Sequence, residues 1–515
     1  MPHMHKLKTL LIGSTAITCI LSLPAMASEA DLLKKIDALE AHIQEMQNTQ
    51  RQLRKELVEQ SEANAAARAA VGRIEAIEKK AANDQATASA EVKAAVAKAE
   101  AVQKTSFAGD IPGSFKIPGT ETSIKLGGAV KIDIADDLSN SLGGSATDWN
   151  GIGFKGSSTS HRGGQVQFTA RQSRLSLETY TPSEVLGPVK AFFESDFYGG
   201  GGSYQGTVVG PNRRDTNSAY FRIRQAYVEA SDVLVGQTWS TFMDMASSPE
   251  TLDIGGPPGF NNGIRQPMVR YSKKAGPGKL YLAVESPDGD FQGANQAQFA
   301  TGASVPSTNS IDVAPDVVVK YEYKADWGQL TTSAVGRWQT ASAGGGTVVG
   351  SFNGRADAFG YGALFGGLVR PVEGAKSGVQ FQVLGGNGIG RYMAPTTSTN
   401  YEYGAVVDQK NKSLESLFAW GAGGGPKIYW ADQWRSSFIY GHSHVSNYHG
   451  LLPTSSLKNL DGFVANLLWS PFRNPASYIG LEYTYAHVEN YTIPTAALSN
   501  KGDANRLQVS VQYAF

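Results

Sequence analysis

The chain of 515 residues carries 46 basic and 46 acidic side chains, so its formal net charge is zero and nothing indicates nucleic-acid binding. Its mean hydropathy is −0.25, and no apolar stretch of roughly 18 residues follows the N-terminus, which argues against a helical membrane protein. The 58 glycines and 21 tyrosines indicate many turns and many aromatic side chains with one polar end.

Residues 1–27 have the form of a secretory signal peptide. A basic segment is followed by an apolar run, Leu10 to Leu23, and by Ala25 and Ala27 at a small-residue cleavage site. The run is short for a membrane span. The only cysteine, Cys19, lies in this segment, so cleavage leaves a chain without thiols. That suits an oxidising envelope compartment and excludes disulfides.

Residues 28–80 carry a heptad pattern that predicts a coiled coil. Its apolar positions, spaced alternately four and three apart between charged residues, are Leu32, Ile36, Leu39, Ile43, Met46, Leu53, Leu57, Val71 and Ile74. Such a stripe needs partner helices, which favours a parallel coiled coil with Gln50 fixing the register. A single helix packed on a globular core is the alternative. Residues 81–110 are predicted to be a helical or flexible spacer.

Residues 111–515 show apolar side chains with a period of two, which predicts β-strands. The first strand is expected at 123–134, with Ile124, Leu126, Val130, Ile132 and Ile134 on one face. Two hairpins are expected at 317–339 and 463–485, with turns near Asp326 and Pro471. Long stretches rich in Gly, Ser, Thr and Asn separate these hairpins.

Short turns alternating with long polar loops fit two all-β architectures. In a soluble sandwich one strand face meets the core and the other meets water. In a membrane barrel one face meets lipid, the other meets an aqueous lumen, and aromatic residues collect at the strand ends. The predicted strands carry Tyr and Trp near their ends and Arg, Lys and Glu in the middle of the polar face. This favours a transmembrane barrel of about 16 antiparallel strands.

The last strand, RLQVSVQYAF, has one apolar parity that we expect to face lipid: Leu507, Val509, Val511, Tyr513 and Phe515. We expect this strand to close the barrel by pairing with the strand near Ser123. Tyr513 and Phe515 resemble the terminal signal by which the outer-membrane assembly machinery recognises barrel proteins.

Several segments together resemble one family. After the heptad region come IPGSFKIPGTETSIKLGGAVKIDI, FTARQSRLSLET, FRIRQAYVEA and LVGQTWSTFMD; the most specific is QTWSTFMD with Pro257-Pro258-Gly259 after it. Over nearly the whole mature chain the sequence resembles the DcaP-like outer-membrane porins of Gram-negative bacteria. The resemblance implies a homotrimer of 16-stranded barrels, a periplasmic coiled-coil stalk, and passage of small, mostly anionic solutes such as dicarboxylates.

The resemblance also implies a basic channel wall. Arg171, Arg174, Arg222 and Arg224 match basic positions along the channel of the family. Alternation independently places Arg222 and Arg224 on the polar face of their strand. Arginine offers a planar donor fork that suits carboxylates. Arg265 and Arg270 are further candidates, although the parity of their strand is ambiguous around Pro267.

A second role for these arginines stays open and can coexist with the first. Salt bridges to Glu178, Glu194 or Asp196 on neighbouring strands would hold the barrel in shape. Two guanidinium groups that lie two residues apart on one strand face repel each other unless they are solvated or paired with anions.

The segment Ser240 to Phe260 resembles the loop that folds into such barrels and narrows them. Asp244, Glu250 and Asp253 would then face the basic wall and produce a transverse field, which orients charged solutes. An ordinary surface loop is the alternative.

No segment predicts an enzyme, a metal site or a cofactor. Val383 to Gly390 imitates a dinucleotide fingerprint, but no helix is expected after it. His442, His444 and His449 are scattered and lack a cysteine or a close carboxylate, so we expect no metal there.

The sequence therefore predicts an outer-membrane porin for passive diffusion of small, preferentially anionic solutes. The expected partners are outer-membrane lipid, the barrel-assembly machinery, the solutes and two further copies of the chain. Cell-wall peptidoglycan is a candidate partner of the stalk. Two alternatives stay open: a phosphate-selective porin, which would need a denser run of Arg and Lys, and an envelope-tethering barrel without significant transport.

Overall fold

The computed structural model divides the chain into two units, Met1–Ala108 and Gly109–Phe515. The described residues are 27–59, 66–106, 108–143, 147–199, 220–261, 263–289, 291–292, 307–344, 352–393, 403–447, 450–452, 456–492 and 498–515. The predicted signal peptide, apart from Ala27, and His449 lie outside them. Within the described residues no helix is long and apolar enough to cross a membrane.

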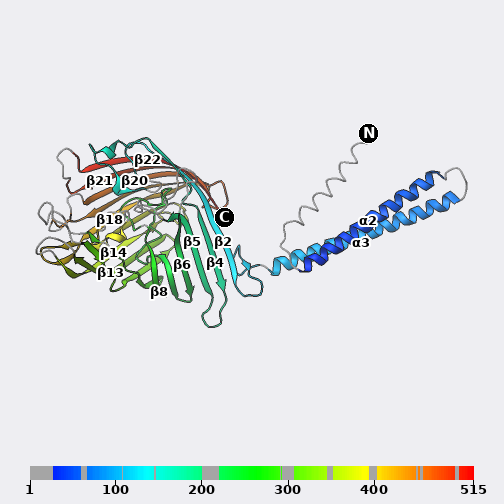
Figure 1. Ribbon diagram of the computed structural model, residues 1–515, viewed down its shortest axis with the longest axis horizontal. Helices are drawn as coiled ribbons and strands as arrows, with labels where there is room; N and C mark the ends of the chain where they lie inside the picture. Colours follow the sequence, from blue (N-terminus) through cyan, green and yellow to red (C-terminus); the bar gives the residue numbers. More distant parts are fainter. Residues whose placement is uncertain are drawn as a thin grey trace. The chain divides into compact units, whose positions relative to one another are not determined.

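The first unit consists of two long helices, α2 (Ala27–Glu59) and α3 (Ala66–Ser106), which contact each other (Figure 1). In α2 the heptad positions Ile36, Leu39 and Ile43 are half-buried, whereas the residues between them are exposed. This burial arises within one chain, so the parallel coiled coil stays a prediction. The helix α3 continues through the segment where the sequence predicts a helical or flexible spacer.

The second unit is a closed barrel of sixteen antiparallel strands among the described residues, as the sequence predicts (Figure 1). In chain order the strands are β2 Ser123–Asp137, β4 Arg174–Thr181, β5 Val189–Gly199, β6 Tyr220–Ala230, β7 Val233–Trp239, β8 Arg265–Ala275, β9 Gly278–Glu285, β12 Asp316–Ala325, β13 Gly328–Gly344, β14 Gly354–Val369, β15 Gly378–Asn387, β18 Phe418–Ala431, β19 Trp434–Val445, β20 Leu457–Trp469, β21 Tyr478–Asn490 and β22 Lys501–Ala514.

Short strands supplement the barrel. The strands β3 (Gln165–Thr169) and β11 (Ser307–Ser310) continue β4 and β12 beyond a break, and β1 (Phe115–Lys116) pairs with the start of β2. A separate three-stranded sheet is formed by β10 (Phe291–Gln292), β16 (Ala405–Asp408) and β17 (Ser413–Ser416). The short 3-10 helices are η1 Trp149–Gly151, η2 Ser158–His161 and η4 Gly390–Tyr392.

The barrel closes where β22 pairs with β2, which confirms the predicted seam. Val130 is opposite Tyr513, and Ile134 is opposite Val509. Gly128 and Phe515 exchange two backbone hydrogen bonds of 3.1 and 3.0 Å. Closure leaves no strand edge with unpaired N–H and C=O groups, which hydrocarbon could not satisfy.

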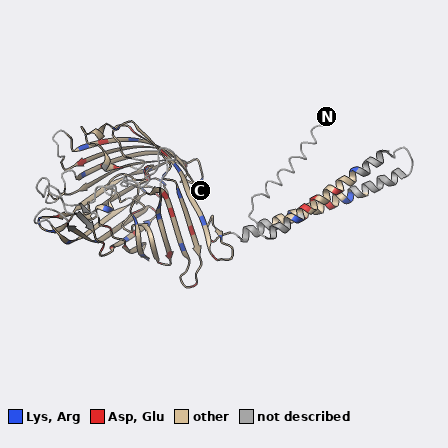
Figure 2. Cartoon of the chain, viewed as in Figure 1, with Lys and Arg blue, Asp and Glu red and all other residues tan. Residues whose placement is uncertain are grey.

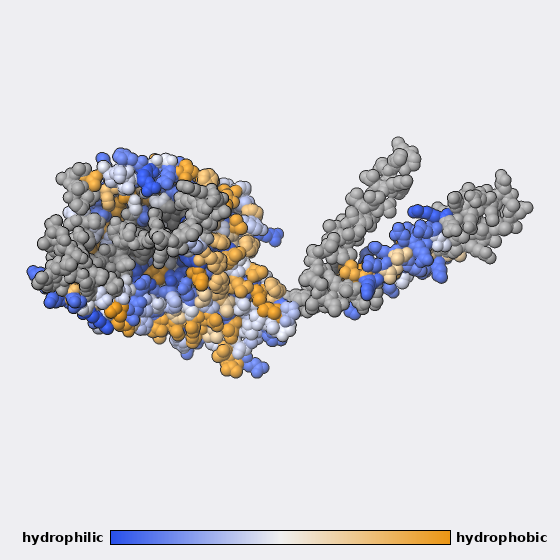
Figure 3. Space-filling view, in the orientation of Figure 1, coloured by the Kyte–Doolittle hydropathy of each residue, from blue (hydrophilic) through white to orange (hydrophobic). Residues whose placement is uncertain are grey.

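Over most of their length the strands turn an apolar face outward and a largely polar face inward. On β22, Leu507 and Val509 are exposed, whereas Gln508 and Ser510, which alternate with them, are buried. Hydrophobic residues cover much of the outer surface over β2 and β4 to β6 (Figure 3). The exposed face is therefore the apolar one, which is the reverse of a soluble sandwich and the arrangement of a barrel in lipid.

The individual strand predictions agree with these elements. The strand expected at 123–134 lies within β2. The first hairpin is β12–β13, in which Ala325 pairs with Gly328 around Asp326 and Trp327. The second is β20–β21. Period-two alternation was sufficient here because each of these strands has one face in each environment.

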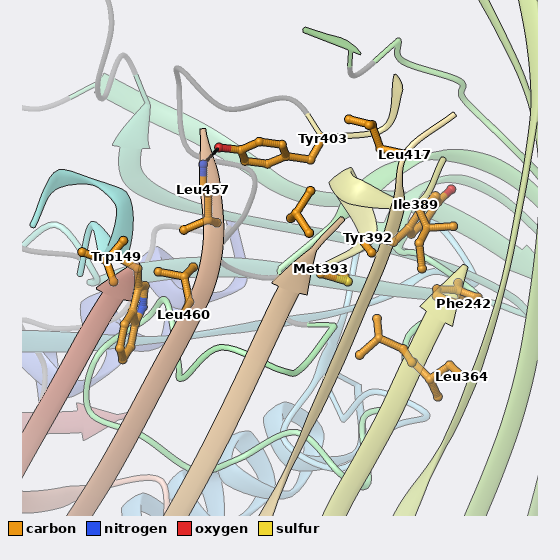
Figure 4. Packing of buried hydrophobic residues seen from close by; sticks show 14 of the residues in the cluster. Trp149, Phe242, Leu364, Ile389, Tyr392, Met393, Tyr403, Leu417, Leu457 and Leu460 are labelled. Atoms are coloured by element: carbon orange, nitrogen blue, oxygen red, sulfur yellow. Dashed lines mark hydrogen bonds between the residues drawn. The ribbon is translucent and has the colours of Figure 1, made fainter. Parts of the chain in front are cut away.

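Long connections at one end of the barrel fold inward and form its hydrophobic core. Trp149, Phe242, Tyr392 and Tyr403 from these connections pack with strand residues such as Leu460 (Figure 4). The hydroxyl of Tyr403 also accepts a hydrogen bond of 2.7 Å from the backbone N–H at position 457. The core therefore lies inside the barrel mouth and supports the loops that enter it.

A buried ion pair crosses the closing seam and generates a prediction. The Arg506 guanidinium on β22 donates to Asp137 on β2 over 2.7 and 3.2 Å, and the two side chains are 1% and 0% exposed. Removing one partner leaves a buried charge, which typically costs about 3–5 kcal/mol. We expect Asp137→Asn to lower the free energy of unfolding by about 3 kcal/mol, measured by urea unfolding in lipid vesicles.

The matched control is Asp432→Asn, which removes the partner of Lys376 in an exposed pair of 2.8 Å between two turns. This change is expected to leave the unfolding curve unaltered, because exposed pairs contribute little. Equal shifts for both variants would show that burial of the seam pair does not matter.

Candidate channel constriction

The connection between β7 and β8 folds into the barrel and follows its inner wall; we call residues 240–261 the constriction loop. The backbone N–H of Thr241 donates to Glu285 on β9 at 2.6 Å. The Ser333 hydroxyl on β13 donates to the backbone oxygen of Phe242 at 2.8 Å. Further along the loop, the side-chain amide of Gln380 on β15 donates to the backbone oxygen of Ser248 at 2.9 Å. The ordinary surface loop is therefore excluded.

The middle of the constriction loop is held by charged groups. Arg435 on β19 and Lys427 on β18 contact the Glu250 carboxylate at 2.8 and 2.7 Å. Glu482 on β21 accepts from the backbone N–H groups of Leu252 and Asp253 at 2.7 and 3.0 Å. Of these strands, β18 and β19 lie opposite β4 to β6 in the order of strand pairing, whereas β21 is separated from β4 only by β22 and β2.

The constriction loop reaches β2 and then returns. Lys131 on β2 donates to the backbone oxygen of Leu252 at 2.6 Å. On the way back, the N–H of Gly259 donates to the Ser443 hydroxyl at 2.8 Å. Gly259 has φ of +82°, and a Cβ there would collide with the backbone oxygen of Ala422, so only glycine allows this approach. The loop therefore lies against the inner wall, with contacts that run from β9 to β2.

Strands β4, β6 and β8 carry four arginines; we call Arg174, Arg222, Arg224 and Arg265 the basic wall. Figure 2 shows basic and acidic residues interspersed along strands β4 to β6. Arg222 makes a two-pronged contact to Asp196 at 2.9 and 2.6 Å. Arg224 contacts Glu194 at 2.6 Å and Asp196 at 2.9 Å. The salt-bridge role left open by the sequence is therefore present for these two arginines, whereas Glu178 pairs with Lys190.

Arg174 and Arg265 make no salt bridge within the described residues, although Arg174 lies directly opposite Asp196 on β5. Arg265 lies 3.5 Å from the centre of the Trp239 ring, and its Nε is buried without a hydrogen-bond partner. It lies within Coulombic range of the other three arginines of the basic wall. Four guanidinium groups therefore face two carboxylates, Glu194 and Asp196, which leaves a net charge of plus two.

The other two predicted arginines lie beside the basic wall. Arg171 belongs to the break between β3 and β4, where its backbone oxygen accepts from Phe197 at 3.1 Å. Arg270 on β8 lies 5.7 Å from the Tyr281 ring centre, and Lys320 lies 4.6 Å from the same ring. Arg270 therefore belongs to a separate basic group further along the wall.

The three acids of the constriction loop are held by loop and wall contacts. Asp244 accepts from Thr331 on β13 at 2.9 Å. Asp253 accepts from both the N–H and the hydroxyl of Thr147 at 2.9 Å. With the contacts of Glu250, these bonds anchor the loop to neighbouring segments. The transverse field stays a prediction.

An exposed side chain of the constriction loop is apolar. Met245 is 52% exposed, whereas its neighbour Asp244 is fully buried. The loop therefore presents at least one uncharged group beside its buried carboxylates.

Glu250 belongs to the loop, outside the strands, and its pKa lies below the ordinary value of 4.5. Burial alone would raise this pKa, but the hydrogen bonds and positive charge of Arg435 and Lys427 lower it by a larger amount. Because the folded-state pKa is lowered, the stabilisation is present at neutral pH and is lost only as the pH falls through that lowered value.

A family model described as a porin subfamily matches residues 68–507. The chain belongs to the porin subfamily. Its fold is similar to the outer membrane channel DcaP of Acinetobacter baumannii, with a TM-score of 0.60 and 20% identity over 78% of this chain and 100% of that one. OmpT of Vibrio cholerae gives a TM-score of 0.44 at 10% identity, over 78% and 99% of the two chains. A search of curated proteins gave no match.

This porin is therefore an outer-membrane channel for passive diffusion rather than an enzyme. The resemblance to DcaP-like porins is confirmed as a likeness of fold and family.

Sequence reasoning missed the residues that hold the constriction loop. Lys131 and Glu482 lie on predicted polar strand faces, so alternation could have identified them as lumen residues. Their partners are backbone groups of the loop, which carry no signal in the sequence. Arg435 also faces the lumen, but it lies on a strand, β19, that was not predicted.

The contacts of Glu250 generate a second prediction. Glu250→Gln removes charged hydrogen bonds that contribute about 1.5–3 kcal/mol each. We expect the middle of the constriction loop to loosen, which increases single-channel current noise and mean conductance in planar bilayers at neutral pH.

Glu178→Gln is the control. It removes the same charge from a lumen acid whose partner is Lys190, 2.9 Å away on the neighbouring strand. If both variants change the current alike, the effect comes from lumen charge and not from anchoring of the loop.

Proposed function

We propose that this porin conducts small hydrophilic solutes with a preference for anions, dicarboxylates in particular, between the constriction loop and the basic wall. The observation that carries the proposal is the net charge of plus two on the basic wall. Fixed charge at a narrowing raises the local concentration of the opposite ion and lowers its barrier.

The two arginines that make no salt bridge within the described residues, Arg174 and Arg265, support the dicarboxylate class. Arg222 and Arg224 already share Asp196 and Glu194, so their charge is largely compensated. Arg174 and Arg265 keep N–H groups that can donate hydrogen bonds to a passing carboxylate. Two such groups suit a solute with two carboxylates, which is the class that the resemblance to DcaP-like porins implies.

The alternatives predict different currents. A phosphate-selective porin would need more uncompensated Arg and Lys at the constriction than the basic wall offers. A barrel that serves as an envelope tether without significant transport would show no single-channel steps. Planar-bilayer recordings with chloride, phosphate and a dicarboxylate separate the three.

We also propose a homotrimer with a periplasmic coiled-coil stalk, in which the heptad stripe of α2 exchanges its contacts within the chain for the same stripe in two other copies. Peptidoglycan is a candidate partner of that stalk. Solutes would enter from the end with long connections and leave at the end with short turns.

The test of selectivity is Arg174→Gln. It removes one positive charge without leaving an unpaired acid among the described residues. A unit charge a few ångströms from a permeating ion in wet surroundings contributes about 0.5–1 kcal/mol, so we expect the anion-to-cation permeability ratio to fall roughly two- to fivefold. Reversal potentials in a salt gradient measure this ratio.

Arg355→Gln is the matched control, because Arg355 is exposed on β14 and pairs with Asp357 at 3.2 Å. Dicarboxylate flux through Arg174→Gln should fall more than flux of a neutral sugar. Equal losses for both solutes, or an equal shift in the control, would contradict anion selection by the basic wall.

We further propose that Tyr513 and Phe515 are read by the barrel-assembly machinery. Their side chains are 54% and 58% exposed on the outer face beside the seam. We expect Phe515→Ala to reduce the amount of heat-modifiable barrel in the outer membrane while export to the periplasm continues. The same change at Phe438, an exposed aromatic on the outer face of β19, is the control, and unaltered insertion of Phe515→Ala would contradict the assignment.

A further inference from the structure

A polar network lies on the outside of the barrel, across β19 to β22. His442, Asp461, His487 and Asp503 occupy directly opposed positions on these four strands; we call them the outer row. At about 4.8 Å between strands, the row is about 14 Å long. Its side chains share the outward parity of exposed residues such as Tyr440 and Leu507.

The outer row contains the same constellation twice. On β19 and β20, Tyr440 donates to Asp461 at 2.5 Å, and Nδ1 of His442 lies 2.8 Å from the same carboxylate oxygen. On β21 and β22, Tyr485 and His487 make the corresponding contacts to Asp503 at 2.7 and 2.8 Å. An ionised carboxylate can only accept, so Nδ1 carries the proton in both pairs.

Each constellation leaves polar atoms free. Within the described residues, Nε2 of both histidines and Oδ2 of both aspartates have no hydrogen-bond partner. The side chains of His442, Asp461 and His487 are 23%, 25% and 22% exposed, and that of Asp503 is 57% exposed. The outer row is therefore pre-oriented by its own hydrogen bonds and open to a ligand.

The position of the outer row relates it to the membrane. Below it the same strands expose an aliphatic surface that includes Leu467, Leu481 and Val509. Above it the strands end within a few residues and long connections begin. Strands β19 to β22 have 12 to 14 residues, enough to cross the hydrocarbon layer. The row therefore lies where the headgroups of the outer leaflet begin.

We propose that the outer row binds the phosphorylated sugar headgroup of an outer-leaflet glycolipid. In their charged form His442 and His487 donate from Nε2 to phosphate oxygens. The free oxygens of Asp461 and Asp503 accept from sugar hydroxyls. The Trp420 ring, 5.0 Å from the His442 ring, offers an apolar face to a sugar ring.

Neighbouring charges favour this ligand over a simple anion. Lys458 and Lys501 flank the row on β20 and β22, and Lys155 acts on Asp503 electrostatically. Lys458 is paired with Glu489 at 3.1 Å. The surface thus mixes acceptors for hydroxyl groups with cations for phosphate, as a phosphorylated sugar requires.

The test compares the full-length protein with a His442→Gln/His487→Gln variant. Native mass spectrometry measures binding of a diphosphorylated glycolipid, its dephosphorylated form and phosphatidylglycerol. We expect roughly tenfold weaker binding of the phosphorylated glycolipid to the variant, the effect of losing a hydrogen bond to a charged group. Phosphatidylglycerol, which lacks the sugar, should bind both proteins alike.

The control variant is Arg355→Gln/Asp357→Asn, an exposed charged pair on β14. Unchanged glycolipid affinity in the histidine variant, or equal losses in both variants, would overturn the proposal. If the variant instead changes only the thermal stability of the oligomer, the outer row is a contact between copies of the chain and the proposal is wrong.

A second measurement needs no variant. Diethyl pyrocarbonate modifies accessible imidazoles, so glycolipid bound to the wild-type protein should protect His442 and His487 severalfold, while the exposed His42 on α2 serves as the reference. Protection that is equal in phosphatidylglycerol, or absent in glycolipid, would contradict the assignment. Neither measurement depends on anion selectivity of the channel.

Discussion

Closure of the backbone hydrogen-bond network is the constraint on which the rest of this structure depends. In hydrocarbon an unpaired strand edge has no water to satisfy it, so β22 must pair with β2. Once the sheet is closed, alternation divides every strand between lipid and lumen. Charged groups on the inner face then meet each other across the seam, as Arg506 and Asp137 do. The same closure therefore fixes both the apolar exterior and the buried ionic interior.

The polar inner wall also makes the constriction possible. A loop that enters the lumen carries backbone groups that need partners. Glu482, Lys131 and Ser443 supply them from three different strands. On the basic wall, Arg222 and Arg224 pair with Asp196 and Glu194, and the four arginines keep a net positive charge. The division of the wall into a loop-binding side and a basic side follows from where the loop lies.

The sequence predicted the fold wherever the environment of a residue follows from its position next to the preceding residue in a strand. Alternation was enough to place β2, the hairpins and the closing strand, because each residue's side follows from that of the residue before it. It could not decide whether Arg222 and Arg224 pair with Asp196 and Glu194, since a register shift between β5 and β6 sets those contacts. Nor could alternation reveal the role of Glu250, because its partner Arg435 lies 185 residues away along the sequence.

Register connects the inner and outer surfaces. Ser443 on β19 points inward and holds Gly259 of the constriction loop, whereas its neighbour His442 points outward and contacts Asp461. A slip of one residue between β19 and β20 would exchange the two faces and remove both contacts at once. Long strands with paired polar groups on both faces make such a slip costly. The contacts that anchor the loop and those that order the outer row therefore stabilise the same register, although they lie on opposite sides of one strand.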